Sequence, residues 1–131
     1  MPLVKKKLSP TKTREILLQA LYQKEISDIS NTNLINQFKK AYREFDISNV
    51  AENLRGINKN NDSLNKSIAD NSSIEIKSIG EIEISILRQS IFEIENSEID
   101  YPIVINEAVK LAKSGQVQFK SEKNGIVQAL S

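Results

Sequence analysis

The side chains of this 131-residue chain that could carry chemistry are mostly basic and gather near its N-terminus. Residues 1–24 contain six basic side chains and one acidic one, a net charge of +5, whereas residues 75–107 contain two basic and eight acidic ones, a net charge of −6. The basic residues that we single out are Lys5, Lys6, Lys7, Lys12 and Arg14. Such a cluster predicts contact with a polyanion, and the alternative is a solvated tail that only adds solubility.

The sequence contains few side chains that could catalyse a reaction. The chain contains no histidine and no cysteine, which excludes the commonest general base, a thiol nucleophile, a disulfide and the usual zinc sites. Three carboxylates at helical spacing, Glu81, Glu83 and Glu93, could bind Mg²⁺ or pair as acid and base. No matching ligand set accompanies them, so we expect no enzymatic activity, no metal site and no cofactor.

Length and composition predict one helical domain. A chain of 131 residues with 39% hydrophobic residues can bury a core of its own, and its four glycines and three prolines are too few for a many-stranded sheet. We expect residues 1–8 to form a flexible basic arm and residues 9–131 a single all-α domain. No apolar run approaches the roughly 18 residues that span a bilayer, and no signal peptide is visible, so we expect a cytoplasmic protein without a membrane segment.

Apolar residues recur at helical spacing through the first third of the chain. Ser9 and Pro10 supply the cap and the first position of a helix that should end near residues 26–28. A second helix should begin at residues 31–33 and continue to Phe45. A third helix is predicted from residues 46–48 onward, with a possible break at the polar stretch 58–62. Their apolar positions include Ile16, Leu17, Ala20, Leu21, Leu34, Ile35, Phe38, Ala41 and Tyr42.

Residues 74–86 allow two interpretations. Alternating isoleucines favour strands, whereas Ser78 and Glu81 form a capping-box pattern and the apolar spacing from Ile79 onward is helical. We predict a helix over residues 79–95 with a short turn before it.

The last two predicted helices close the chain. Pro102 fits a first turn and Gly115 the position just past the end, so residues 101–113 should form a central packing helix. A final helix is predicted over residues 117–129.

Four separated stretches resemble one known family. The chain reads L-Q-A-L-Y-Q at residues 18–23 and I-L-R-x-x-x-F-E-I at residues 86–94. It continues with Y-x-x-V-I-N-E-A-V-x-L-A-K at residues 101–113 and N-G-I-V at residues 124–127. In order and spacing these stretches resemble the NusB family of bacterial transcription antitermination factors. The resemblance implies an all-α fold of about seven helices in two small sub-bundles.

The resemblance also implies a function without cofactors or catalysis. It implies an RNA-binding factor that binds the boxA single-stranded RNA of nascent ribosomal RNA together with the small-subunit ribosomal protein NusE, within the RNA polymerase antitermination complex. The alternative is a diverged helical adaptor that binds proteins and has lost specific RNA readout. Two departures from the family pattern suggest this alternative. Only Lys12 and Arg14 match the family's N-terminal arginine cluster, and Glu122 occupies the position of a family aromatic residue.

Charge and position along the chain, taken together with the resemblance, give the expected site residues. The expected RNA-binding residues are Lys5, Lys6, Lys7, Lys12, Arg14, Tyr22, Lys113, Phe119, Lys120 and Lys123. The alternative for Tyr22 is a structural role as a half-buried core residue. The alternative for the three C-terminal lysines is that they form an ordinary solvated helix face. Glu81 and Glu83 are the expected contacts for the protein partner, with an ordinary solvated acidic face as the alternative.

Overall fold

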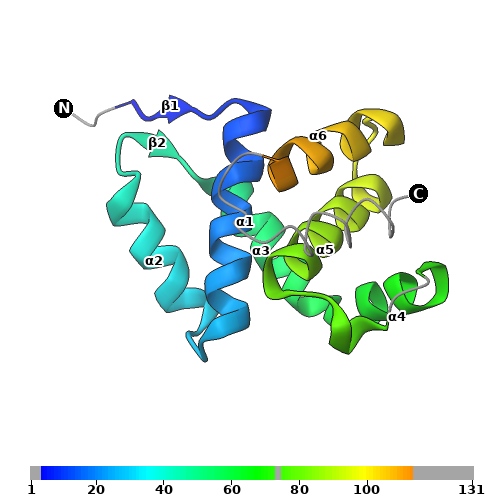
Figure 1. Ribbon diagram of the computed structural model, residues 1–131. Helices are drawn as coiled ribbons and strands as arrows, with labels where there is room; N and C mark the ends of the chain where they lie inside the picture. The colour runs from blue at the N-terminus through cyan, green and yellow to red at the C-terminus, as the bar shows by residue number, and fades with distance from the viewer. Residues whose placement is uncertain (1–3, 73–74, 114–131) are drawn as a thin grey trace. The chain divides into compact units, whose positions relative to one another are not determined.

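A computed structural model describes residues 4–72 and 75–113 of the chain (Figure 1). These residues contain six α-helices, one 3-10 helix and two strands of two residues each, which confirms the predicted all-α class. The helix predicted over residues 117–129 lies outside them. The chain divides into two compact units, residues 1–56 and 57–131, and the boundary falls within helix α3 (Ser48–Lys59).

Helix α1 (Pro10–Ile26) begins and ends where the sequence predicts. The Ser9 hydroxyl accepts a hydrogen bond from the backbone N–H of Lys12 at 3.1 Å, and Thr13 donates its hydroxyl to the Ser9 carbonyl at 2.9 Å. This cap satisfies one of the orphan N–H groups of the first turn, and Pro10 needs none. The predicted apolar positions of α1 are buried: Ile16, Leu17, Ala20 and Leu21.

Helix α2 (Asn31–Ala41) is shorter than predicted. Its cap is Ser30, whose hydroxyl accepts from the backbone N–H of Asn33 at 3.1 Å, so the predicted cap at residues 31–33 is one position late. The helix ends because Tyr42 leaves the helical region of backbone conformation, with φ −119° and ψ 40°. Phe45 therefore lies in a strand rather than in the helix.

Two short strands join the N-terminal arm to the segment after α2. Strand β1 (Lys6–Lys7) runs parallel to β2 (Phe45–Asp46), and the backbone N–H of Lys6 donates to the Glu44 carbonyl at 2.8 Å. Figure 1 shows β1 beside β2 in the N-terminal unit. The stretch that we expected to be a flexible arm thus has two residues in regular structure, because its extended backbone pairs with residues 39 positions further along the chain.

The predicted break in the third helix is present. Helix α3 ends at Lys59 and α4 (Asn61–Asn71) begins two residues later, with Asn60 as its cap residue. At the other end of α3, the Asp46 carboxylate accepts the backbone N–H of Ser48 at 2.9 Å. The polar stretch therefore separates two helices, as its composition indicated.

In the ambiguous region the helical interpretation is confirmed. A 3-10 turn, η1 (Ile76–Ser78), precedes α5 (Glu81–Asn96). The capping box is wrong: Gly80 is the cap residue and no side chain caps the helix, because α5 starts too far from Ser78. The backbone N–H of Ser78 instead closes the 3-10 turn on the Glu75 carbonyl at 2.9 Å.

Helix α5 is the centre of the C-terminal unit and contacts both α4 and α6 (Tyr101–Lys113). Ile68 of α4 and Ile84 and Leu87 of α5 form a buried cluster. Arg88 donates its Nε–H to the Asn65 side chain at 2.9 Å, a second link between α5 and α4. The helix predicted at residues 101–113 is confirmed as α6, but the central position that we expected for it belongs to α5. The buried positions of α6 are Val104, Ala108, Leu111 and Ala112.

Candidate nucleic-acid interface

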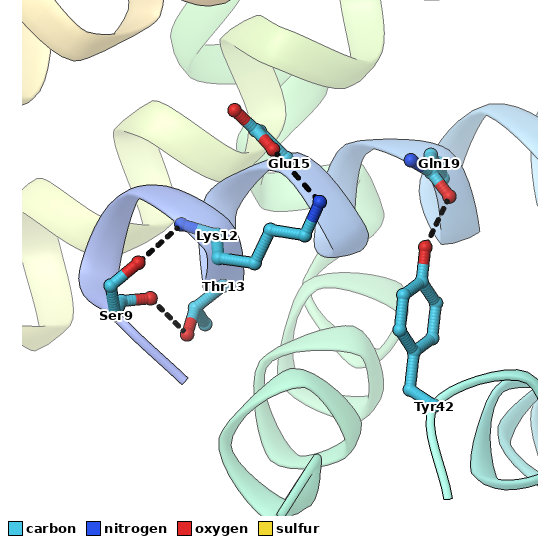
Figure 2. A network of polar contacts seen from close by, with 6 residues as sticks. All are labelled: Ser9, Lys12, Thr13, Glu15, Gln19 and Tyr42. Atoms are coloured by element: carbon cyan, nitrogen blue, oxygen red, sulfur yellow. Dashed lines mark hydrogen bonds and ion pairs between the residues drawn. The ribbon is translucent and has the colours of Figure 1, made fainter. Parts of the chain in front are cut away.

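The start of α1 holds Lys12 and Arg14, the two residues through which the sequence resembles an N-terminal basic cluster. Figure 2 shows that Lys12, beside the Ser9 cap, extends along the helix to Glu15. Its ammonium lies 3.4 Å from the Glu15 carboxylate, and the two side chains are 48% and 42% exposed. Lys12 is therefore accessible to an anion, but a phosphate must compete with Glu15 for it.

Arg14 does not lie beside Lys12 on the surface. It is 9% exposed and falls in the buried stripe that continues through Leu17, Leu18 and Leu21 at intervals of three and four residues. The reason is helical phase, because positions 12 and 14 are about 200° apart around the helix axis. The expected phosphate contact through the Arg14 guanidinium therefore does not fit this conformation.

The lysine triplet lies at the surface. Lys5, Lys6 and Lys7 are all exposed, and strand β1 fixes the backbone of the last two. Tyr22 is half-buried on α1, so both of its interpretations remain compatible with the structure. Lys113 is exposed in the last turn of α6. Phe119, Lys120 and Lys123 lie outside the described residues.

The two acidic residues expected to bind a protein partner differ in exposure. Glu81 is the first residue of α5 and is exposed, whereas Glu83 is 3% exposed. Glu83 shares its face of α5 with the buried Ile86, Leu87 and Ser90, three, four and seven residues further on. A carboxylate in the first turn of a helix also interacts favourably with the helix dipole. The structure therefore places Glu83 inside the protein and not on an exposed acidic face.

Polar side chains connect α1 to α2 and to the turn after it. The Tyr42 hydroxyl hydrogen-bonds the Gln19 side chain at 3.2 Å (Figure 2), and the amides of Gln23 and Gln37 exchange hydrogen bonds at 3.2 and 3.3 Å. The Tyr42 ring is parallel to that of Phe38, with centroids 6.0 Å apart. These contacts hold the end of α2 close to the exposed side of α1.

The sequence analysis missed three exposed basic residues at the end of α2. Lys39 and Lys40 lie in its last turn and Arg43 follows it. Their K-K-x-x-R spacing was visible, but nothing in the sequence connects it to the lysine triplet more than 30 residues earlier.

The carboxylates that could have supported catalysis do not converge. No group of three potential metal-ligating side chains occurs among residues 4–72 and 75–113. A cleft between α4, α5 and α6 is lined mainly by isoleucine and leucine side chains, and Glu95 is the carboxylate at its edge. Glu81, Glu83 and Glu93 lie elsewhere on α5. Within the same part of the chain, no helix is long and apolar enough to cross a membrane.

These features define a class of protein. It is a small all-α protein whose N-terminal unit, residues 1–56, carries a net charge of +4 and whose C-terminal unit, residues 57–131, carries −3. Exposed lysines lie on the first unit and an exposed acidic helix start lies on the second.

Comparison with known proteins identifies the family. The profile of the NusB family matches residues 11–127. The chain is 30% identical over 124 residues to the transcription antitermination protein NusB of Yersinia enterocolitica, an alignment that covers 92% of this chain and 90% of the relative. It is 38% identical over 105 residues to the protein of that name from Buchnera aphidicola, with 78% and 73% covered. The chain therefore belongs to the NusB family.

Proposed function

We propose that this chain is a transcription antitermination factor that binds boxA-type single-stranded RNA together with ribosomal protein NusE. The observation that carries the proposal is the family match, which extends over residues 11–127 and so includes all six described helices apart from the first residue of α1. Relatives that align with most of the chain are named transcription antitermination protein NusB. A factor that acts on nascent RNA in the RNA polymerase complex works in the cytoplasm.

The proposed RNA contacts on the N-terminal unit are electrostatic. Lys5, Lys6 and Lys7 are exposed, and Lys12 is half exposed at the start of α1. Lysine ammonium groups bind phosphates as point charges, and each neutralised phosphate adds to the salt dependence of binding. We assign Arg14 a supporting role in the packing of α1, since its side chain is buried. Tyr22, Lys113, Phe119, Lys120 and Lys123 stay predicted contacts.

The proposed contact with NusE is made by Glu81 at the exposed start of α5. Glu83 is assigned to the interior of α5 instead, because a side chain that is 3% exposed presents almost no surface to a partner. Glu81→Gln should weaken NusE binding and leave the thermal stability unchanged. Glu98→Gln, an exposed carboxylate beyond the end of α5, is the matched control.

The RNA proposal is tested by fluorescence anisotropy with a boxA oligonucleotide and a scrambled one, with and without NusE. We expect tighter binding of boxA than of the scrambled RNA, and tighter binding still with NusE. Lys12→Gln should lower the slope of log K against log salt by about 0.7, the value for one phosphate contact on a single strand. Lys66→Gln is the control, since Lys66 also pairs within a helix, with Asp70 at 3.4 Å, but lies on α4. Equal affinity for the two RNAs would refute the proposal.

A second candidate function is a helical adaptor that binds NusE and does not read RNA sequence. Two observations favour it: Arg14 is 9% exposed, and Lys12 is paired with Glu15. Both weaken the basic cluster at the start of α1. In this case the complex with NusE forms normally, and boxA and scrambled RNA bind it equally.

A further inference from the structure

The described basic residues of the N-terminal unit concentrate at one edge. We call this the β1–α2 edge and define it by Lys5, Lys6, Lys7, Lys39, Lys40 and Arg43. The pairing of β1 with β2 brings the two groups together, because Lys6 lies opposite Phe45, two residues after Arg43. The hydrogen bond from the Lys6 N–H to the Glu44 carbonyl, at 2.8 Å, fixes that register. Figure 1 shows the backbone of β1 beside β2, the strand that follows α2. Segments distant in sequence thus contribute exposed cations to the same edge.

The charges of this edge are only weakly offset within the protein: Lys5 helps to lower the pKa of the Asp46 carboxyl, as the smallest of the causes. All six side chains are exposed, and across residues 4–72 and 75–113 none of them has a carboxylate oxygen within 4 Å of its charged nitrogen. Two other basic residues of the same unit do have partners: Lys12 pairs with Glu15, and Lys24 donates to the Ile29 carbonyl at 2.9 Å. The nearby Asp46 carboxylate accepts the N–H of Ser48 at the start of α3, and its interaction with Lys5 is weaker than its hydrogen bonds to Ser48.

Local stability explains only part of this arrangement. Lys39 and Lys40 interact favourably with the C-terminal end of the α2 dipole. Local stability does not explain the two lysines of β1, because both side chains are exposed and the strand buries no apolar side chain. Placing them beside three further cations adds repulsion, which an external anion would relieve. This arrangement of charges is therefore more favourable when an anionic ligand is bound than in the free protein.

We propose that Lys39, Lys40 and Arg43 extend the contacts already proposed for the lysine triplet, so that the whole β1–α2 edge binds the phosphate backbone of single-stranded RNA. The choice of RNA as the ligand rests on the function proposed above. A row of cations along a strand and the turn beside it suits a linear, flexible polyanion. A membrane surface needs apolar side chains to insert beside the cations, and in the described part of the N-terminal unit the exposed large hydrophobic residues are Val4, next to Lys5, and Ile26, at the far end of α1.

The test compares two charge-matched triple variants of the full chain. The edge variant is Lys39→Gln, Lys40→Gln and Arg43→Gln, and the control is Lys59→Gln, Lys66→Gln and Lys77→Gln, which removes three exposed cations from elsewhere. The probe is oligouridine of about 12 nucleotides, which contains no boxA, and binding is measured between about 50 and 200 mM salt. Both variants should fold, because all six substituted side chains are exposed. Thermal unfolding checks this.

We expect the edge variant to lower the slope of log K against log salt by about 2, while the control keeps the wild-type slope within about 0.5. A second variant, Lys6→Gln with Lys7→Gln, should lower it by about 1.4. Equal slopes for the edge and control variants, or no binding of oligouridine by the wild type, would overturn the proposal. So would loss of binding to phosphatidylglycerol vesicles in the edge variant with its RNA binding intact.

The same titrations separate this surface from the proposed function. If boxA and scrambled RNA bind equally while the edge variant still loses salt dependence, the antitermination role fails and the phosphate surface stands. If boxA is preferred and the edge variant behaves as the control does, the surface fails and the role stands.

Discussion

Replacing Glu15 by Gln should tighten RNA binding. In the folded protein the Glu15 carboxylate lies 3.4 Å from the Lys12 ammonium, and both side chains are about half exposed. The pair is a local i, i+3 contact on one helix, so its removal leaves the cap at Ser9 and the buried face of α1 unchanged. In this variant the Lys12 ammonium can bind a phosphate without first breaking its ion pair with Glu15.

The size of the effect follows from the exposure of the pair. An exposed ion pair on a helix contributes about 0.3–0.5 kcal/mol, and the repulsion between Glu15 and an incoming phosphate is of similar size. Together they predict a gain of about 0.5–1 kcal/mol, which is a decrease of about two- to fivefold in Kd. The gain should shrink at high salt, since the screening length falls to about 3 Å at 1 M.

The assay is anisotropy with labelled boxA RNA, run as a double-mutant cycle over Lys12→Gln, Glu15→Gln and the double variant. Glu52→Gln is the control because it removes the same charge from an exposed position on α3. The Glu15 effect should fall by about half in the Lys12→Gln background, where only the repulsion is relieved. If Glu15→Gln and Glu52→Gln tighten binding equally, net charge alone is responsible and Lys12 makes no phosphate contact. A weaker affinity of Glu15→Gln would refute the reasoning outright.

Three further predictions concern stability. Ser9→Ala removes the side-chain cap of α1 and should destabilise the protein by about 1 kcal/mol, measured by urea unfolding. Hydrogen bonds from the Ser48 side chain and backbone, with a smaller effect of Lys5, hold the pKa of Asp46 below its ordinary 3.8. That stabilisation is present above the unfolded-state pKa and is lost as the pH falls through the lower folded-state value. The melting temperatures of the wild type and Asp46→Asn should therefore differ at pH 6 and converge as the pH falls below 3.8. Ile86→Ala, at a fully buried position of α5, should cost about 2–5 kcal/mol by urea unfolding, and a loss below about 1 kcal/mol would contradict the packing of the C-terminal unit.

Local pattern predicted the helices because helix formation depends on neighbours within one or two turns. The Ser9-Pro10 start of α1, the break near Asn60 and the helix over residues 101–113 each rest on contacts between residues close in sequence. The capping box at Ser78 failed for a related reason. The pattern specifies which residues can cap a helix, but the backbone conformation at Gly80 decides where the helix begins.

Side-chain accessibility was less predictable. Arg14 and Glu83 are charged, so composition favoured exposed positions for both, yet they are 9% and 3% exposed. Their phase on the helix could have indicated otherwise. Arg14 stands three and four residues before Leu17 and Leu18, and Glu83 three and four residues before Ile86 and Leu87. At these two positions the face of the helix, and not the charge of the side chain, determines whether the residue is exposed.

The amino-acid sequence alone established that this chain is helical, where most of its helices lie and to which family it is similar, because apolar periodicity and short motifs are local properties. Tertiary structure decided which charges reach the surface together. The pairing of β1 with β2 brings Lys6 and Lys7 next to the segment that follows α2, although the paired positions are 39 residues apart in the sequence. A backbone hydrogen bond between such distant segments has no signature in either one, so the β1–α2 edge exists only in the folded chain.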